Sequence, residues 1–190
     1  MLGIAGGVHY AAHVRAPWPP GVRVREEPRQ QKVEQPKSWT MKGYEITPLA
    51  AYQIRARVLH TEAYHFDRES DLSPVDWALG WRSMSDSAAL KRLRISQGGR
   101  WYFYHWDADP PLAESDIIAH SANTHILPAT PQVAREVKAV RAGDVIDARG
   151  YLVSIRGPDG YHWESSLSRT DTGAGSCEVF WVRSLEVEPR

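Results

Sequence analysis

The chain has 190 residues, and its 23 Lys and Arg balance 23 Asp and Glu, so the formal net charge at pH 7 is zero. This length suits one domain with a real core. A balanced charge disfavours a protein devoted to nucleic acid, which usually carries a basic surface. The one cysteine excludes an internal disulfide and so a disulfide-stapled secreted fold. Eight tryptophans and eight tyrosines indicate an aromatic core or a groove that stacks a ligand.

The first segment, residues 1–16, is small and largely apolar. Its uncharged run ends at Arg15, short of the ~20 residues that cross a bilayer. No basic stretch precedes it, so it is a poor signal peptide, and it fits either a leader or the stub of a membrane anchor whose true start lies upstream. The protein is expected in the cytoplasm as the sequence is written, and anchored to a membrane if the chain starts upstream.

Residues 17–43 hold five prolines among charged and amide side chains, which favours an extended, solvated linker. A single β-rich domain is therefore predicted over residues 44–190. On this prediction, deleting the first forty residues would leave the unfolding transition almost unchanged, because they contribute little apolar burial.

Two strands are predicted in the first half of the domain. Apolar and polar residues alternate over 52–58, which is the period of a half-buried strand. The aromatic run 100–106 follows the turn signal Gly98-Gly99 and also predicts a strand. Residues 87–97 remain open between helix and strand.

A helix is predicted between those strands, ending near Asp86. Ser73 can cap it and Pro74 suits its first position. Trp77 and Trp81 would then lie four residues apart, on one face.

A second helix is predicted from Pro131, after Thr130, and Gly143 would follow its end. Three valines at helical spacing would form its buried stripe: Val133, Val137 and Val140. Strands should follow over 144–156, 161–167 and 177–187, with a turn at 157–160. Gly150 inside the first of these indicates a bulge or a close backbone approach.

These elements predict an α+β fold that is mainly antiparallel β, with a small barrel-like sheet and two or three short helices. A helix leading into a long strand after an earlier meander is typical of small Greek-key barrels such as the OB fold. An SH3-like or irregular α+β sheet is the alternative. Fold-level analogy of this kind carries no function.

Three stretches also resemble a group of bacterial, mostly proteobacterial, proteins of unassigned function. They are Leu72-Ser-Pro-Val-Asp-Trp-Ala-Leu-Gly-Trp81, Ser121-Ala-Asn-Thr-His-Ile-Leu-Pro-Ala129, and Ser165-Ser-Leu-Ser-Arg-Thr-Asp-Thr-Gly173 with Cys177-Glu178. The resemblance covers roughly residues 44–187 and implies a shared domain, often behind an N-terminal membrane segment. It implies no activity, so no catalytic role is transferred.

Residues that could carry chemistry gather in two predicted loops, 120–128 and 165–177. Cys177 could act as a nucleophile if His120 or His125 served as its base, because the thiolate is the attacking form. Asn123 or Asp171 would orient that base. Against this hypothesis, a lone cysteine is commonly a small buried apolar residue.

No metal or other cofactor is predicted. His120 and His125 are five residues apart, and a helical zinc site needs histidines four apart. Scattered ligands such as Asp116, Asp171 or Glu178 could converge only through loop folding.

The second loop is the best candidate binding surface. Its arginine, hydroxyls and glycines suit a carboxylate, a phosphate or a peptide terminus, although Arg169 and Asp171 could instead pair to staple the loop. The predicted ligand-binding residues are Asn123, His125, Ser166, Arg169, Asp171 and Cys177.

The motifs without a recognisable reaction signature favour a binding domain over an enzyme. It would be an uncharacterised bacterial module that recognises a small polar or anionic ligand or a partner protein, and an association with the cell envelope is compatible with this hypothesis. One alternative is a Cys/His-dependent hydrolase or transferase. Another is an OB-like domain for single-stranded nucleic acid, with aromatics at 100–106 beside Lys91, Arg92 and Arg94; the charge balance disfavours it.

Overall fold

The structure is a computed structural model that describes residues 18–189, so the segment 1–16 lies outside the described residues. The strands are β1 (Arg29–Lys32), β2 (Trp39–Met41), β3 (Tyr44–Ala63), β4 (Val75–Gly80), β5 (Arg94–Gly98), β6 (Trp101–His105), β7 (Ser121–Pro128), β8 (Val145–Arg156), β9 (His162–Glu164) and β10 (Glu178–Val187). The helices are α1 (Ser87–Leu90), α2 (Glu114–Ala119) and α3 (Pro131–Ala139), with 3-10 turns at Glu69–Asp71, Arg82–Ser85 and Pro158–Gly160.

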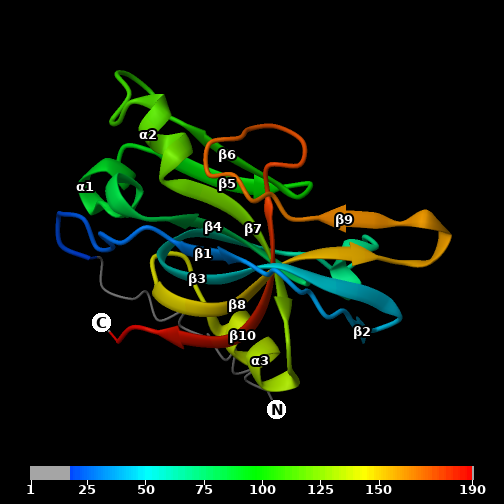
Figure 1. The fold of residues 1–190 in the computed structure, drawn as a ribbon. Helices are drawn as coiled ribbons and strands as arrows, with labels where there is room; N and C mark the ends of the chain where they lie inside the picture. The colour runs from blue at the N-terminus through cyan, green and yellow to red at the C-terminus, as the bar shows by residue number, and fades with distance from the viewer. Residues whose placement is uncertain (1–17, 190) are drawn as a thin grey trace, which may run out of the picture.

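Five strands close into a ring (Figure 1). The order is β3, β4, β7, β10 and β8, and β8 pairs again with β3. All of these pairings are antiparallel except the parallel pair β7–β10. β1 and β2 pair with β3, β9 pairs with β8, and β5 and β6 form a separate two-stranded sheet. The predicted α+β fold with a mainly antiparallel, barrel-like sheet and short helices is confirmed.

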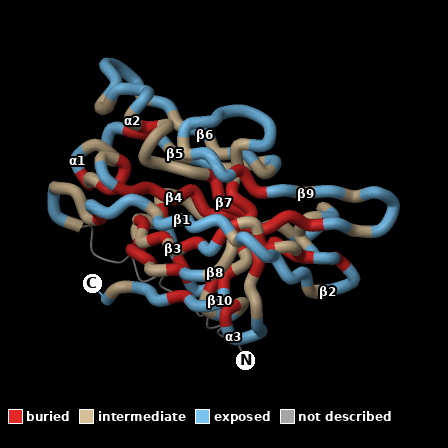
Figure 2. Tube along the Cα trace, in the orientation of Figure 1, coloured by how far each residue is buried: buried red, intermediate tan, exposed pale blue. Residues whose placement is uncertain are grey.

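The ring encloses the main apolar cluster (Figure 2). Its members come from all five ring strands and from α3, and Tyr52 and Phe180 meet edge to face at 5.0 Å inside it. A second cluster joins β2 and β9 to the outer faces of their neighbours, and a third lies under the β5–β6 sheet. Burial of this apolar surface drives the fold.

The helix α3 forms as its sequence predicts. The Thr130 side chain accepts a hydrogen bond from the Val133 N–H, and Pro131 occupies the first helical turn. The three predicted valines are buried against the ring cluster. Within residues 18–189 no helix has both the length and the apolar character needed to cross a bilayer.

Gly150 marks a close approach of two strands, as predicted. A Cβ added there would lie 1.9 Å from the Trp181 carbonyl oxygen, so any side chain would force the backbones apart. The register of β10 against β8 shifts beside this contact, between Val182 and Ser184. The strands predicted from 100, 144 and 177 are confirmed with small changes at their ends, and residues 87–97 contain both α1 and the start of β5.

The helix predicted after Ser73 is wrong, because this segment forms the strand β4. β4 lies between β3 and β7, and all six of its residues are buried. The Ser73 hydroxyl bonds the Val75 carbonyl at 3.3 Å rather than capping a helix. Burial on both faces removes the alternation that identifies a half-exposed strand, so the local capping pattern was misleading.

The predicted loop 120–128 is also wrong as a loop. Residues Ser121–Pro128 form β7, which is inserted between β4 and β10. Its polar residues Asn123, Thr124 and His125 are nevertheless buried. Buried polar side chains on a central strand need hydrogen-bonding partners. The partners of Asn123 and His125 lie on the outer face of β7.

Within the predicted linker 17–43, the described residues 18–43 are not a solvated linker but part of the folded domain. β1 and β2 pair with β3, and Val24 is fully buried in the ring cluster. The Trp18 indole N–H donates to the Gly143 carbonyl at 2.7 Å. The folded part of the chain therefore extends back at least to Trp18, and the predicted boundary at residue 44 is too late.

Candidate functional site

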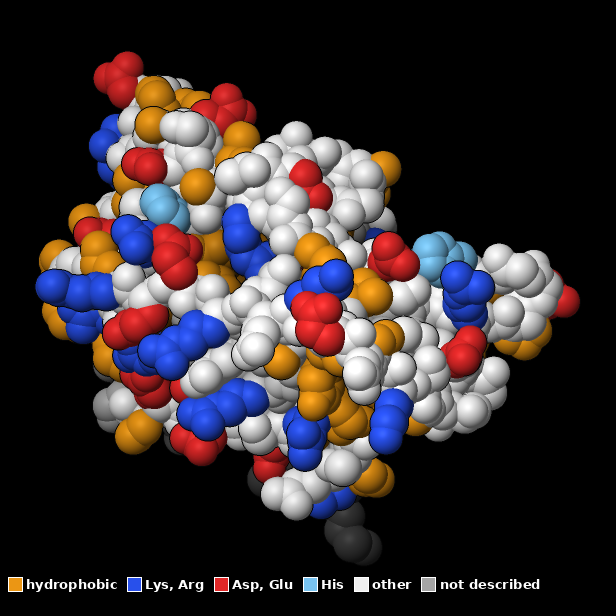
Figure 3. Space-filling view, viewed as in Figure 1, with side chains coloured by type: hydrophobic (Ala, Val, Ile, Leu, Met, Phe, Trp, Pro, Cys, Tyr) orange, Lys and Arg blue, Asp and Glu red, His pale blue; other side chains and the backbone are white. Residues whose placement is uncertain are grey.

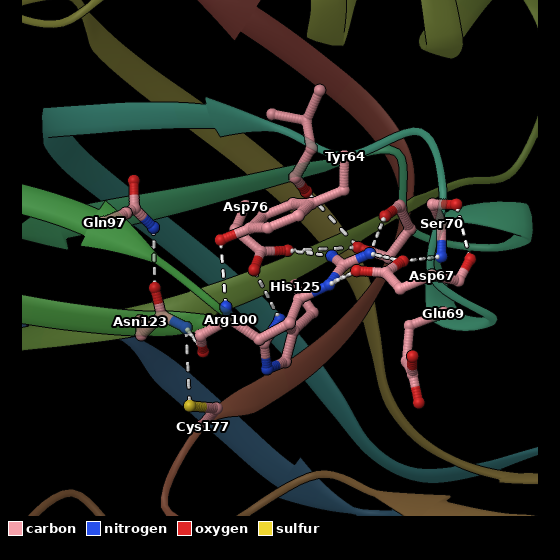
Figure 4. A network of polar contacts seen from close by, with 12 residues as sticks. Tyr64, Asp67, Glu69, Ser70, Asp76, Gln97, Arg100, Asn123, His125 and Cys177 are labelled. Atoms are coloured by element: carbon pink, nitrogen blue, oxygen red, sulfur yellow. Dashed lines mark hydrogen bonds and ion pairs between the residues drawn. The ribbon is translucent and has the colours of Figure 1, made fainter.

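Three neighbouring ring strands bring an acid, a histidine and the cysteine to one outer face (Figure 4). Asp76 on β4 lies directly opposite His125 on β7. The parallel pairing of β7 with β10 sets Thr124 opposite Glu178, so Cys177, one residue earlier, comes beside Asn123. Because side chains alternate along a strand, these residues point away from the ring interior that Trp77 and Phe180 fill.

The Asp76 carboxylate contacts the His125 ring. His125 Nδ1 lies 3.0 Å from Asp76 Oδ2. Neither atom has a well-aligned hydrogen bond to any other group, and both side chains are almost completely buried. The charge of a protonated His125 ring therefore depends on Asp76 for its compensation.

Arg100 holds the other oxygen of this carboxylate. Its Nη1 donates to Asp76 Oδ1 at 2.7 Å, and its Nε and Nη2 donate to Asp67 at 3.0 and 2.7 Å. Its guanidinium also lies 3.9 Å from the centre of the Tyr64 ring. The fork of an arginine fixes carboxylates in direction as well as distance, so Asp76 is held rigidly behind His125.

On its other side the His125 ring lies beside Cys177 (Figure 4), and the cysteine influences the titration of the ring. Since Nδ1 faces Asp76, the nitrogen available to the sulfur is Nε2. Burial lowers the pKa of His125, but the hydrogen bonds to Asp76 and Cys177 and their charges raise it further, to about 9. The ring also packs on Trp163, with centroids 4.8 Å apart. A protonated imidazole is thus favoured at neutral pH.

Asn123 presents an amide N–H to the cysteine. Its Nδ2 donates to Cys177 Sγ at 3.4 Å and to the Arg100 carbonyl at 3.0 Å, while its Oδ1 accepts from Gln97 at 2.6 Å. The carbonyl contact fixes which end of the amide faces the sulfur. Figure 4 shows the four side chains in this order, from Gln97 through Asn123 to Cys177, with His125 alongside.

Cys177 opens onto a pocket of about 190 Å³. Asp76 and His125 do not line this pocket, so they lie behind the cysteine. The lining residues come from the end of β4, from β6, α2 and β7, and from the loop before β10 with the first residue of that strand: Trp81, Trp101, Tyr102, Tyr104, Ile118, Ser121, Ala122, Asn123, Ser168, Arg169, Asp171, Thr172, Gly173, Ser176, Cys177 and Glu178. A small molecule can therefore meet the thiol against an aromatic wall.

The loop 165–177 forms one wall of the pocket, but its charged residues do not form the Arg169–Asp171 pair that the sequence suggested. Arg169 Nη1 pairs with Glu178 Oε1 at 2.8 Å, not with Asp171. Asp171 instead accepts from the Ser166 hydroxyl at 2.6 Å. Burial raises the pKa of Glu178 to about 7, although Arg169 opposes the shift. The hydroxyl and guanidinium predicted to bind an anion are thus engaged within the protein.

His120 lies apart from this group. Its Nδ1 is 2.9 Å from the Ser83 hydroxyl, and its ring nitrogens lie 3.8 Å from Glu27 and Asp116. His125 is therefore the histidine placed to act on Cys177. In the part of the chain that the structure describes, no three His, Cys, Asp or Glu side chains are grouped to hold a metal ion.

Reasoning from the sequence missed Asp76 and Arg100. An aspartate within the apolar run Val75–Gly80 was the available signal, because a buried carboxylate requires a partner. The helix predicted after Ser73 obscured this signal. Arg100 follows two glycines at the β5–β6 turn, with a φ of 69°, and nothing in the local pattern links it to β4.

Comparison of the chain with family models, with curated proteins and with solved structures gave no match. The resemblance to a bacterial group therefore stays a prediction, and the site is interpreted from its own geometry.

Proposed function

We propose that the protein is a cysteine-dependent hydrolase or acyltransferase with Cys177 as its nucleophile. The observation that carries this proposal is the position of the His125 ring, between the Asp76 carboxylate and the Cys177 thiol. A nucleophile, a base that contacts it and an acid that orients the base recur on unrelated folds that catalyse acyl transfer.

His125 would take the Cys177 proton and form an imidazolium beside a thiolate. The raised pKa of His125, about 9, supports a ring that keeps this proton near neutral pH. Asp76 would hold the proton on Nδ1 and so direct Nε2 at the sulfur. An imidazolium contact of this kind favours the reactive form of a cysteine.

The thiolate would attack the carbonyl carbon of an ester, thioester or activated amide. As the sulfur–carbon bond forms, the carbonyl oxygen becomes an oxyanion, and the Asn123 amide is placed to donate to it. Collapse of this intermediate breaks the bond to the leaving group, which takes the proton from His125. Water or a second nucleophile, deprotonated by His125, then attacks the thioester and restores the thiol.

The pocket supports this chemistry because the substrate would reach Cys177 from one side, while the groups that activate the thiol lie on the other side. The substrate would enter against Trp101 and the residues around Cys177, while Asp76 and His125 stay buried. Charged groups kept from water interact more strongly than exposed ones. A base hidden behind its nucleophile is therefore protected from competing proton donors.

Binding of a small polar ligand without chemistry is the second candidate, as the sequence predicted. The observation that favours it is the same pocket, with polar groups from loop 165–177 facing aromatic rings of β6. This function requires the pocket but not the contact between His125 and Cys177, so the two candidates respond differently to substitution of that histidine.

The proposal is tested by trapping an acyl group on the protein with p-nitrophenyl acetate. We expect a rapid release of p-nitrophenolate equal to the protein concentration, and intact mass measurement should find one acetyl group, on Cys177. Cys177→Ser should remove this rapid phase, and His125→Gln should slow it at least ~tenfold.

His162→Gln is the matched control, because His162 is half exposed on β9 and contacts Ser154 and Glu164. It should acylate at the rate of the unmodified protein. Equal acylation rates in His125→Gln and His162→Gln would overturn the catalytic proposal and leave ligand binding as the function of the pocket.

A further inference from the structure

A second recessed surface crosses the outer faces of β1, β3, β8 and β10, away from Cys177. It consists of two hollows of about 640 and 390 Å³ that share Tyr151 and Arg183. We call it the basic groove, and its lining residues are Arg29, Gln30, Gln31, Val33, Gln35, Lys37, Trp39, Pro48, Ala51, Tyr52, Gln53, Arg149, Gly150, Tyr151, Trp181, Arg183 and Ser184.

The charge of the groove is of one sign. Arg29, Lys37, Arg149 and Arg183 line it, and no Asp or Glu does. Arg149 contacts Asp147 at 3.3 Å. The other three are exposed and make no side-chain ion pair or hydrogen bond within residues 18–189. Zero net charge over the whole chain conceals this local excess.

Aromatic rings lie between these cations. Trp181 contacts Trp39 at a centroid distance of 4.5 Å and stacks near Tyr151 at 6.1 Å, with 28° between the latter two planes. Figure 3 shows hydrophobic side chains flanked by Lys and Arg on the face that carries β1, β8 and β10.

These rings are not explained by packing alone. Trp39, Tyr151 and Trp181 are only partly buried where they pack on the second apolar cluster, so each keeps ring surface open to the groove. A ring that served only to fill space would gain more from complete burial. The rings and the unpaired cations together indicate a ligand.

We propose that the basic groove binds single-stranded nucleic acid. The unpaired cations would contact successive phosphates, and bases would stack on the aromatic cluster, which is how sequence-independent single-strand sites combine charge with π surface. The groove is recessed and carries rings between its cations, which a flat anionic membrane would not use. An anionic polysaccharide would meet the charge but offers no planar base to stack.

The cations beside β6, which the sequence suggested for nucleic-acid binding, are less available to phosphates than those of the basic groove. Arg94 beside the aromatic β6 is paired with Asp107, and the Arg92 guanidinium donates to the Asp109 carbonyl at 3.0 Å. Cations already engaged with the protein contribute less to phosphate binding. The nucleic-acid site that we propose therefore lies in the basic groove and not at the residues suggested by the sequence.

The test measures fluorescence anisotropy of a labelled oligothymidylate of about 15 nucleotides, within the length that such domains cover. The full chain should bind it with micromolar affinity at low salt. The double variant Arg29→Glu/Arg183→Glu should weaken binding at least ~tenfold and lower the slope of log affinity against log salt by about 1.4, or about 0.7 for each lost phosphate contact.

Tyr151→Leu separates stacking from charge, since it keeps apolar bulk and removes the π face. It should weaken binding by about tenfold without changing the salt slope. Lys138→Glu is the matched control, because Lys138 is exposed on α3 and lines neither hollow; its affinity should fall less than ~twofold. Thermal unfolding of each variant confirms that it is folded.

Three outcomes would overturn the proposal: no binding at low salt, an equal loss in Lys138→Glu and the double variant, or heparin competition together with no effect of Tyr151→Leu. The last would identify a general cation surface. Cys177→Ser should bind the oligonucleotide unchanged, so the result is independent of the proposed catalytic function.

Discussion

The inside of the ring and the outer face of β4 and β7 are both buried, but the first consists of apolar side chains and the second of ionisable and polar ones. The interior is filled by apolar side chains such as Trp77, Phe180 and Ile54. The outer face holds Asp76 and His125, tied to Arg100 and Cys177. Apolar burial stabilises a fold directly, whereas buried ion pairs scarcely repay their desolvation. This difference supports the proposal that the outer network serves chemistry, while the interior provides the stability of the fold.

The largest expected effect is in the interior. Phe180→Ala should lower the free energy of unfolding by about 4 kcal/mol, because it removes a fully buried ring and leaves a cavity. Urea denaturation measures the change. Phe103→Ala is the control, since Phe103 is 52 % exposed on β6, and it should cost less than about 0.5 kcal/mol. Equal losses would contradict the assignment of the ring interior as the main core.

The pH dependence of stability tests the outer face. His125 has a pKa of about 9 in the folded protein against 6.5 unfolded, so its contribution is complete below pH 6.5 and disappears as pH rises through 9. The loss is on the order of 3 kcal/mol. Glu178, raised from 4.5 to about 7, also makes stability fall as pH rises, over a lower window.

Urea denaturation of the unmodified chain and of His125→Gln between pH 5 and 9.5 separates these contributions. The variant should lose the decline between pH 6.5 and 9 and keep the one between 4.5 and 7. An unchanged decline above pH 6.5 would show that His125 does not hold its proton as described.

Replacement of Asp76 should lower both the free energy of unfolding and the reactivity of Cys177. Asp76→Asn leaves the buried His125 ring without its carboxylate and Arg100 with Asp67 alone, which should cost about 3 kcal/mol. Asp67→Asn is the control: Asp67 also pairs with Arg100, but its side chain is 34 % exposed, and the cost should stay below about 1 kcal/mol. A similar cost for both would mean that Asp76 is not the anchor of the network.

These predictions also show which features the sequence could reveal. α3, β8 and β10 were predicted because caps, valine spacing and turn residues are local signals. β4 was not, because its burial depends on the strands at both sides. Likewise His125, Asn123 and Cys177 were chosen by residue type, and the structure brings these three together. Asp76 could not be added without the register of β4 on β7, which only the ring fixes.

The smallest expected stability change concerns the N-terminal segment. Deleting residues 1–40 removes β1 and the buried Val24, so the free energy of unfolding should fall by about 2 kcal/mol or more. This reverses the expectation from composition, under which the segment was removable without consequence. Denaturation of the shortened chain at an unchanged midpoint would restore the solvated-linker interpretation.

The most direct test of the central claim is the rate at which iodoacetamide alkylates Cys177 as a function of pH. The chain has one cysteine, so the modified mass reports this site alone. The account predicts alkylation at pH 6.5 that is faster than that of a free thiol, at least ~tenfold slower in His125→Gln and unchanged in His162→Gln. A rate that rises only near pH 8.5, as for an unactivated cysteine, and that is the same in all three proteins would contradict it.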